Sequence, residues 1–86
     1  MPLVCVHGAL RHLAGGAGEH QLRAPTVLGL LRELEREQPA LAGWIVDERG
    51  LIRRHINVFV NGERGGEDTA VAADARVEIL PAITGG

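Results

Sequence analysis

The amino-acid sequence predicts an α+β fold in which one helix packs across one face of a mixed sheet of four or five strands. Residues 27–34 carry apolar side chains at i, i+3, i+4 and i+7, the spacing of a single helical stripe. Residues 55–61 alternate in the way that a half-buried strand does. Residues 77–81 have the pattern of a buried last strand that is closed by a proline.

The first 24 residues predict an opening β-hairpin. Residues 3–7 are almost continuously apolar, as in a central strand that is covered on both faces, or on one face and at an interface. Residues 8–18 are rich in glycine and predict a loop. Residues 19–24 alternate polar and apolar side chains, which favours a half-exposed strand.

The main helix is expected to begin after Thr26 and to run to about Gln38. Thr26 is a good N-cap because its hydroxyl group can accept a hydrogen bond from a free amide of the first turn. Pro39 cannot donate the backbone hydrogen bond that a further turn requires, so the helix should end before it. Gly29 lies inside this helix, at a cost of about 0.5–1 kcal/mol relative to alanine. The apolar stripe must cover the sheet, and its members are Val27, Leu30, Leu31 and Leu34.

The second half of the chain predicts two further strands. Residues 40–54 favour a short helical turn, a loop and a lead-in strand, and the strand at residues 55–61 then points Ile56, Val58 and Val60 toward the core. Asn61–Gly62 is a turn signal, and residues 63–75 are mostly small or polar. The last strand covers residues 76–80 with Val77 and Ile79 inward, and Pro81 ends it.

The predicted order is strand, strand, helix, strand, strand. With the first and last strands as parallel neighbours at the centre of the sheet, this is the β-grasp arrangement. We expect one β-grasp domain over residues 1–81, followed by a flexible C-terminal tail, residues 82–86. Five residues at about 3.3–3.6 Å each can project on the order of 17 Å from the sheet.

Composition excludes several classes of function. The formal charge of −2 and the pI of about 6.0 give no field that would attract nucleic acid or an anionic membrane. No apolar run approaches the length of a membrane span, and the N-terminus lacks the features of a secretory signal, so we expect a cytoplasmic protein. The chain contains no serine, lysine or tyrosine, which excludes serine triads, Schiff-base lysines and GK[ST] phosphate loops.

The histidines and the one cysteine do not predict a reactive centre. Cys5 lies in the middle of an apolar strand, so we expect a small buried hydrophobic residue rather than a reactive thiol. No metal site is expected, because the spacing of the four histidines with one another and with Cys5 is not that of metal ligands. These histidines are His7, His12, His20 and His55.

The ending Gly85–Gly86 makes the terminal carboxylate the candidate reactive group. Two residues without Cβ can enter a narrow active site where any side chain would clash. The same dipeptide also occurs at residues 15–16 and 65–66, where turns explain it, so the dipeptide alone is weak evidence. The terminal dipeptide is informative because it follows a predicted strand and a proline.

The chain resembles the MoaD/ThiS-type ubiquitin-like sulfur carriers over nearly its whole length. The matching stretches are Ala9-Leu10-Arg11 with Leu13-Ala14-Gly15-Gly16, Thr26 with residues 27–34, HINVFVNGE at residues 55–63, and above all VEILPAITGG at residues 77–86. The joined pattern of strand, proline, small residues and diglycine is specific, although each piece alone is weak.

The resemblance implies a carrier without catalytic residues or a bound cofactor of its own. Its Gly86 carboxylate would be adenylated by an ATP-dependent, ubiquitin-activating-type adenylyltransferase/sulfurtransferase. Sulfur would then displace AMP and leave a covalent thiocarboxylate, which a sulfur-acceptor biosynthetic enzyme consumes. Thr84 departs from the small residues usual before the diglycine.

The resemblance leaves the pathway open between cysteine, molybdopterin and specialised metabolites. The longer segment at residues 40–54 makes the chain less similar to the compact thiamin carriers. The segment HINVFVNGE is particularly similar to the carrier that feeds an O-phosphoserine-type cysteine synthase. Related carriers also supply sulfur to tRNA bases.

The partner interface is expected on the face of the sheet that the helix leaves open. Phe59 and Leu80 have the wrong parity for the covered face and should meet near the tail, although each alone would be an ordinary exposed residue. His7 stands where the family carries a larger apolar interface residue, and Arg11 and Arg64 are candidates for the rim. The tail itself supplies Pro81, Ala82, Ile83 and Thr84 before the diglycine.

Two other classes of function compete with the carrier. A ubiquitin-like modifier would share the activation step and end in an amide bond between Gly86 and lysines of target proteins. A structural β-grasp interaction module would keep its binding without the two glycines.

Overall fold

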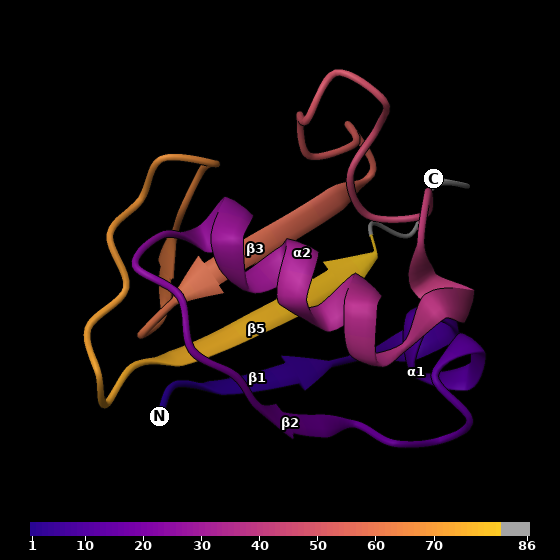
Figure 1. Ribbon diagram of the computed structural model, residues 1–86, viewed down its shortest axis with the longest axis horizontal. Helices are drawn as coiled ribbons and strands as arrows, with labels where there is room; N and C mark the ends of the chain where they lie inside the picture. The colour runs from indigo at the N-terminus through magenta and orange to yellow at the C-terminus, as the bar shows by residue number, and fades with distance from the viewer. Residues whose placement is uncertain (82–86) are drawn as a thin grey trace.

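Five strands form one mixed sheet in the computed structural model, which describes residues 1–81 (Figure 1). The strand order across the sheet is β2-β1-β5-β3-β4. The strands are β1 (Leu3–Val6), β2 (Glu19–Gln21), β3 (Ile56–Val60), β4 (Glu63–Arg64) and β5 (Arg76–Pro81). The helices are α1 (Gly8–Leu13), α2 (Val27–Glu37) and the short 3-10 helix η1 (Pro39–Leu41).

Strand β5 occupies the middle of the sheet. It runs parallel to β1, with Val4 opposite Val77, and antiparallel to β3, with Val58 opposite Ile79. Val77 and Ile79 are completely buried. The prediction that the first and last strands are parallel neighbours at the centre of the sheet is therefore confirmed.

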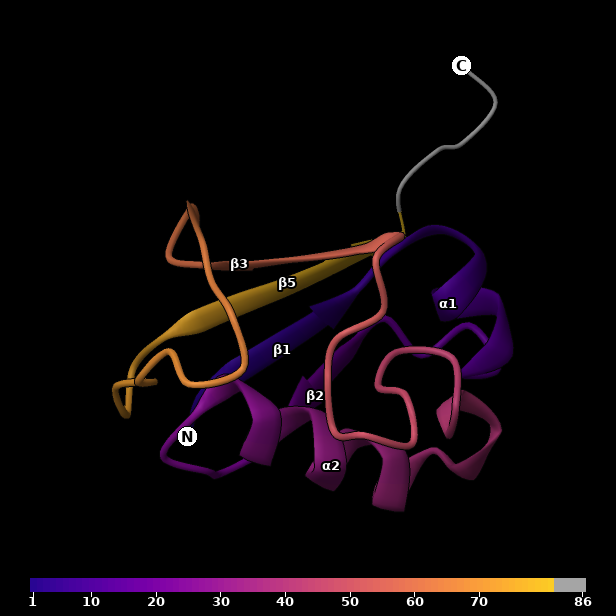
Figure 2. The ribbon, with the colours of Figure 1, turned by 90° about the horizontal axis from the view of Figure 1, so that it is seen from above.

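Helix α2 covers one face of the sheet (Figure 2). Thr26 is its N-cap, and the threonine Oγ1 accepts a hydrogen bond from the backbone N–H of Gly29 at 3.2 Å. The helix ends at Glu37, and Pro39 then begins η1. The predicted apolar stripe is completely buried, and its members are Val27, Leu30, Leu31 and Leu34. The helix and its boundaries are confirmed within one residue.

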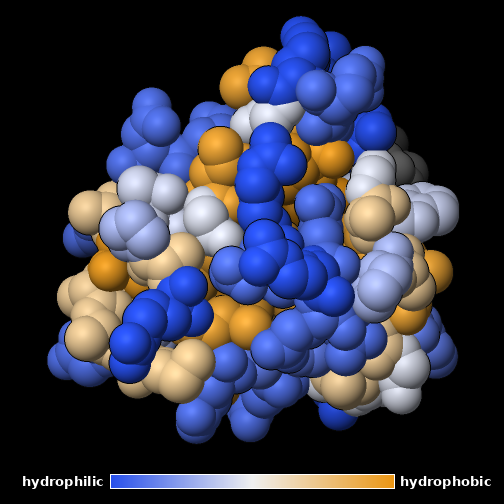
Figure 3. Space-filling view, viewed as in Figure 1, coloured by the Kyte–Doolittle hydropathy of each residue, from blue (hydrophilic) through white to orange (hydrophobic). Residues whose placement is uncertain are grey.

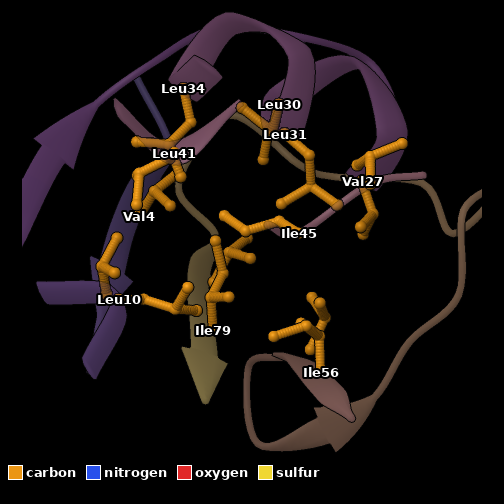
Figure 4. Close-up of a cluster of buried hydrophobic side chains, with 14 of the residues drawn as sticks. Val4, Leu10, Val27, Leu30, Leu31, Leu34, Leu41, Ile45, Ile56 and Ile79 are labelled. Carbon is orange, nitrogen blue, oxygen red and sulfur yellow. The ribbon is translucent and has the colours of Figure 1, made fainter. Parts of the chain in front are cut away.

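The core lies between α2 and the sheet (Figure 4). Leu41 and Ile45, from η1 and the segment that follows it, are completely buried and belong to this core. The predicted lead-in strand within residues 40–54 is absent, since only the isolated bridge between Val46 and Ile52 forms there. The core members from the strands include Val4, Val6, Ile56, Val58, Val77 and Ile79.

The Asp47 carboxylate holds the turn within this segment. Its Oδ1 accepts hydrogen bonds from the backbone N–H groups of Arg49 at 2.8 Å and Leu51 at 3.1 Å. The hydrogen bond from the Arg49 side chain is the largest cause that lowers the pKa of Asp47, and the bond from the Leu51 amide acts in the same direction. The turn is therefore built around an ionised carboxylate.

The prediction of a loop over residues 8–18 was wrong, because α1 occupies Gly8–Leu13. Leu10 and Ala14 are buried in the core and Leu13 packs against it, so one side of this short helix is apolar. A helix of six residues is not stable by propensity alone and forms here because tertiary packing supports it. The high glycine content concealed the apolar spacing.

The strand pairings at the two edges of the sheet agree more closely with the predictions from the sequence. Strands β1 and β2 pair antiparallel as predicted, but α1 connects them and β2 ends at Gln21 rather than at residue 24. Asn61 and Gly62 have φ values of 50° and 85°, which fits the two-residue turn that joins β3 to β4. Pro81 is the last residue of β5 and pairs with Ile56, one residue beyond the predicted end.

The outer surface of the α2 layer is polar. Figure 3 shows mostly hydrophilic side chains over this face, with hydrophobic atoms visible between them. Arg32, Arg36 and Glu37 are exposed there, in agreement with a solvated helix face. Within residues 1–81, no helix has both the length and the apolar character that crossing a membrane requires.

Gly29 is expected to be required by packing, despite its low helix propensity. A Cβ atom at position 29 would lie 2.8 Å from the Cβ of Ala24, well inside normal carbon contact distance. We therefore expect Gly29→Ala to destabilise the protein by about 1–2 kcal/mol in urea unfolding, because overpacking outweighs the gain in propensity.

The Ala24→Gly background is the matched control for this prediction. Removing the Ala24 methyl group relieves the clash, so in that background Gly29→Ala should raise stability by about 0.5–1 kcal/mol. A gain in stability from Gly29→Ala in the otherwise unchanged protein would contradict the packing argument.

Candidate partner-docking site at the end of strand β5

Pro81 is the last residue of β5 and the last residue that the structure describes. Its backbone pairs with Ile56 of β3, and its ring lies against the start of α1, where a Cβ on Gly8 would approach the Pro81 Cγ to 3.0 Å. Gly8 has a φ of 62°, so both its conformation and its neighbour favour glycine. The remaining predicted tail residues lie outside the described residues, namely Ala82, Ile83, Thr84, Gly85 and Gly86.

The face of the sheet opposite α2 carries the other predicted interface residues. Strand register aligns one row of side chains across β1, β5, β3 and β4 on this open face. The row consists of Cys5, Glu78, Phe59 and Arg64. Phe59 therefore lies between an acidic and a basic residue.

Phe59 and Leu80 share the open face but are not directly opposite each other. Phe59 pairs with Glu78, and Leu80 pairs with Asn57, so the two apolar side chains are diagonal neighbours on adjacent strands. Both are half-buried. They form a small apolar patch close to the end of β5, with polar residues beside each member.

Glu78 lies at the centre of the charges on this face. Its Oε1 is 3.6 Å from Nε2 of His7 and 3.5 Å from Nε of Arg76. The contact with His7 is an ion pair when the imidazole is protonated. All three side chains are partly exposed, so each contact contributes only about 0–1 kcal/mol. A partner can therefore displace them at little cost.

Arg11 and Arg64 lie toward opposite edges of the sheet. Arg64 is on edge strand β4, directly across from Phe59. Arg11 is on α1, its Nε donates to the backbone oxygen of Gly16 at 3.1 Å, and it lines a hollow of about 320 Å³ together with His7 and Arg76. The two arginines do not share one rim of the apolar patch.

Glu78 and Arg76 also belong to this face, although no sequence motif singles them out. Both have the parity of Leu80, since they lie two and four residues before it on the same strand. The period of a β-strand was therefore sufficient to place them. Apolar residues of the wrong parity stand out in a strand sequence, whereas charged residues at the same positions look like ordinary solvated side chains.

Cys5 is on the open-face side of β1 but is almost inaccessible, with 3% of its surface exposed. Burial is the main cause that raises the pKa of the Cys5 thiol, and the nearby Arg76 opposes this effect. The predicted burial of this residue is confirmed. Among residues 1–81, no group of three histidine, cysteine, aspartate or glutamate side chains is placed to hold a metal ion.

The sheet order and the single covering helix define a ubiquitin-like β-grasp domain, and solved structures support this class. The structure of SAMP1 from Haloferax volcanii superposes with a TM-score of 0.89 at 27% identity and covers 99% of this chain and 98% of that chain. The Amycolatopsis orientalis BexX/CysO complex gives a TM-score of 0.88 at 30% identity, with both chains covered completely.

The sequence comparisons identify the family. The ThiS family model matches residues 4–86. The sulfur carrier protein CysO of Mycobacterium tuberculosis is 30% identical over 89 aligned residues, which cover 96% of each chain. The chain therefore belongs to the ThiS family.

The Cys5 thiol is expected to react slowly in the folded protein. Burial and a raised pKa both reduce the amount of accessible thiolate, the species that reacts with disulfide reagents. At pH 8, modification by Ellman's reagent should be at least about tenfold slower in native protein than in urea-unfolded protein. Equal rates in the two states would contradict a buried thiol.

Proposed function

We propose that this protein carries sulfur on the carboxyl group of Gly86 and has no catalytic residues of its own. The observation that carries the proposal is the match to the ThiS family through residue 86, together with a full-length relative that is a sulfur carrier. The β-grasp body supports it, since β5 ends at Pro81, five residues before Gly86.

The chemistry requires activation, because a carboxylate is a poor electrophile. An activating enzyme joins the Gly86 carboxylate to the α-phosphate of ATP and releases pyrophosphate. Hydrosulfide then attacks the carbonyl carbon, the bond to AMP breaks, and a thiocarboxylate remains. If the donor is a persulfide, a second thiol must cleave the acyl disulfide, and the donor leaves as an ordinary disulfide.

Two partners follow from this proposal. The first is an ATP-dependent, ubiquitin-activating-type adenylyltransferase/sulfurtransferase, and the second is a biosynthetic enzyme that accepts the sulfur. The solved complex of BexX with CysO supports the second partner. The carrier binds no cofactor itself, and its need for ATP and reduced sulfur favours the cytoplasm.

Conjugation to target proteins through Gly86 is the alternative function. The similarity to small archaeal modifier protein 1 supports it, with structures from Haloferax volcanii and Methanosarcina acetivorans at TM-scores of 0.89 and 0.85. Since the chain contains no lysine, only the amino group of Met1 could receive a second copy. Conjugates on lysines of targets would therefore carry single units or linear chains.

Gly86 is expected to exchange one oxygen atom for sulfur. Intact-mass spectrometry of the protein, incubated with its activating enzyme, ATP and sulfide, should show a gain equal to the mass difference between sulfur and oxygen. Deletion of Gly86 should abolish the gain, because the next carboxyl group lies one residue short of the reaction centre.

The Cys5→Ala variant is the matched control in this assay. It should acquire sulfur at the same rate as the unchanged protein, because the buried thiol takes no part. A gain that requires ATP but is retained without Gly86 would contradict the proposal. Higher-mass adducts on reducing, denaturing gels would instead support the modifier alternative.

The open face is expected to contribute to docking of the activating enzyme. Phe59→Ala should weaken binding by about tenfold, because it removes the larger member of the apolar patch. Val71→Ala, a truncation outside the open face, should change the dissociation constant by less than about twofold. Equal affinities for unchanged protein and Phe59→Ala would show that the patch is not used.

A further inference from the structure

A second apolar surface lies beside Pro81, at the same end of the sheet as the predicted tail. It is a hollow of about 360 Å³, and we call it the Trp44 groove. The eight residues that line it are six apolar residues and two histidines. The larger apolar residues of the lining are Leu10, Leu13, Trp44, Ile56 and Pro81, and the two histidines are His12 and His55.

Trp44 combines an anchored backbone with an exposed side chain. The backbone N–H of Trp44 donates to the backbone oxygen of Leu41 at 3.0 Å, and the next residue, Ile45, is completely buried. The side chain of Trp44 is left 53% exposed, although tryptophan usually loses most of its surface on folding. The exposed indole is therefore accessible to a partner from an anchored stretch of backbone.

The place of Trp44 in the fold distinguishes it from the other exposed hydrophobic residues. The described residues include three exposed large hydrophobic side chains, Met1, Trp44 and Leu51. Of these, Trp44 alone lines a hollow that also includes Pro81. Leu51 is exposed to a similar extent, at 42%, but does not line the groove. An exposed tryptophan in a concave apolar setting is typical of a binding hot spot.

The chain beyond Pro81 is short, so an enzyme that acts on Gly86 must come close to this groove. Five residues, 82–86, follow Pro81, so the Gly86 carboxyl group is at most about 18 Å from Pro81, which lines the groove. Any enzyme that encloses this carboxyl group in its reaction centre must therefore bring its own surface close to Pro81. The surface around Pro81 then becomes part of the interface.

We propose that the Trp44 groove receives an aliphatic or aromatic side chain of the enzyme that activates Gly86. This proposal rests on the proposed function. The predominantly apolar lining fits such a side chain. The groove supplies docking affinity and takes no part in the chemistry.

The groove and the open-face patch differ in character. Phe59 on the open face has Glu78 and Arg64 as cross-strand neighbours, so a partner meets charges of both signs there. The groove offers its partner apolar carbon and imidazole groups. Both surfaces adjoin the end of β5, so one enzyme can contact both while it holds the terminus.

A fluorine label on the single tryptophan tests the proposal directly. The full chain is produced with 5-fluorotryptophan, which labels Trp44 alone. The enzyme used is one that has been shown to transfer sulfur to the unchanged protein in the mass assay. Its addition should shift the fluorine resonance. In the double variant Trp44→Phe and Leu51→Trp, the fluorinated tryptophan is at position 51 instead. The enzyme should not shift the resonance of this probe.

Binding measurements give the matched comparison. Trp44→Ala should raise the dissociation constant for the same enzyme by about 10- to 30-fold, whereas Leu51→Ala should change it by less than about twofold. Both side chains are exposed, so both variants are expected to fold. Leu51→Ala should acquire sulfur at the rate of the unchanged protein, since Leu51 does not line the groove.

Several results would overturn the proposal. Unchanged affinity for Trp44→Ala, with normal sulfur transfer to the unchanged protein, would reject the groove and leave the carrier function standing. If Ile83→Ala shifts the Trp44 resonance without enzyme, the chain's own tail is the occupant. If that resonance depends on protein concentration without enzyme, a second copy is the occupant. Failure of sulfur transfer itself would instead reject the proposed function.

Discussion

The pairing of β5 on both of its edges is the constraint on which the rest of the structure depends. β1 and β3 bond to it from either side, while its alternate residues Val77 and Ile79 are completely buried under α2. Full burial of each such side chain contributes about 1.5–3 kcal/mol. A register slip of one residue would turn both side chains to the opposite face, so the register is strongly specified. The same register fixes the position of Pro81 opposite Ile56 at the end of β5.

This constraint gives one end of the molecule two candidate docking surfaces. On the open face, Leu80 lies beside the β5 terminus because Ile79 must face the core. On the other side, the end of β5 meets α1 and the segment that contains Trp44, and the groove forms between them. In the proposed function, a partner that takes up Gly86 meets both surfaces. The body thus supplies position and affinity, and the chemistry belongs to the enzymes.

Local patterns were sufficient for the elements whose burial is periodic. The stripe of α2 and the alternation in β3 each contain enough apolar residues to reveal the face that must be buried. Helix α1 was missed because its stability comes from Leu10 and Ala14 packing into a distant core, while its glycines indicate a loop. Gly29 was judged by helix propensity, which takes no account of Ala24 on the neighbouring segment.

The docking surfaces could be predicted only in part, for a related reason. Parity placed Phe59 and Leu80 on the open face, but their diagonal relation depends on the β3–β5 register, which the sequence alone does not give. The Trp44 groove combines α1, residue 44, the start of β3 and the end of β5. No local pattern joins segments so far apart in sequence, so only the fold reveals that Trp44 lies beside Pro81.

The proposed function requires that the partner enzyme acts on the carboxyl group of residue 86. Exchange of labelled pyrophosphate into ATP, catalysed by the activating enzyme, measures its adenylation without any later step. Exchange is expected with the unchanged protein and not when a single alanine is added after Gly86, because an added methyl group would clash in a narrow site that accepts only glycine. Equal exchange with both proteins would show that residue 86 is not the group that is activated.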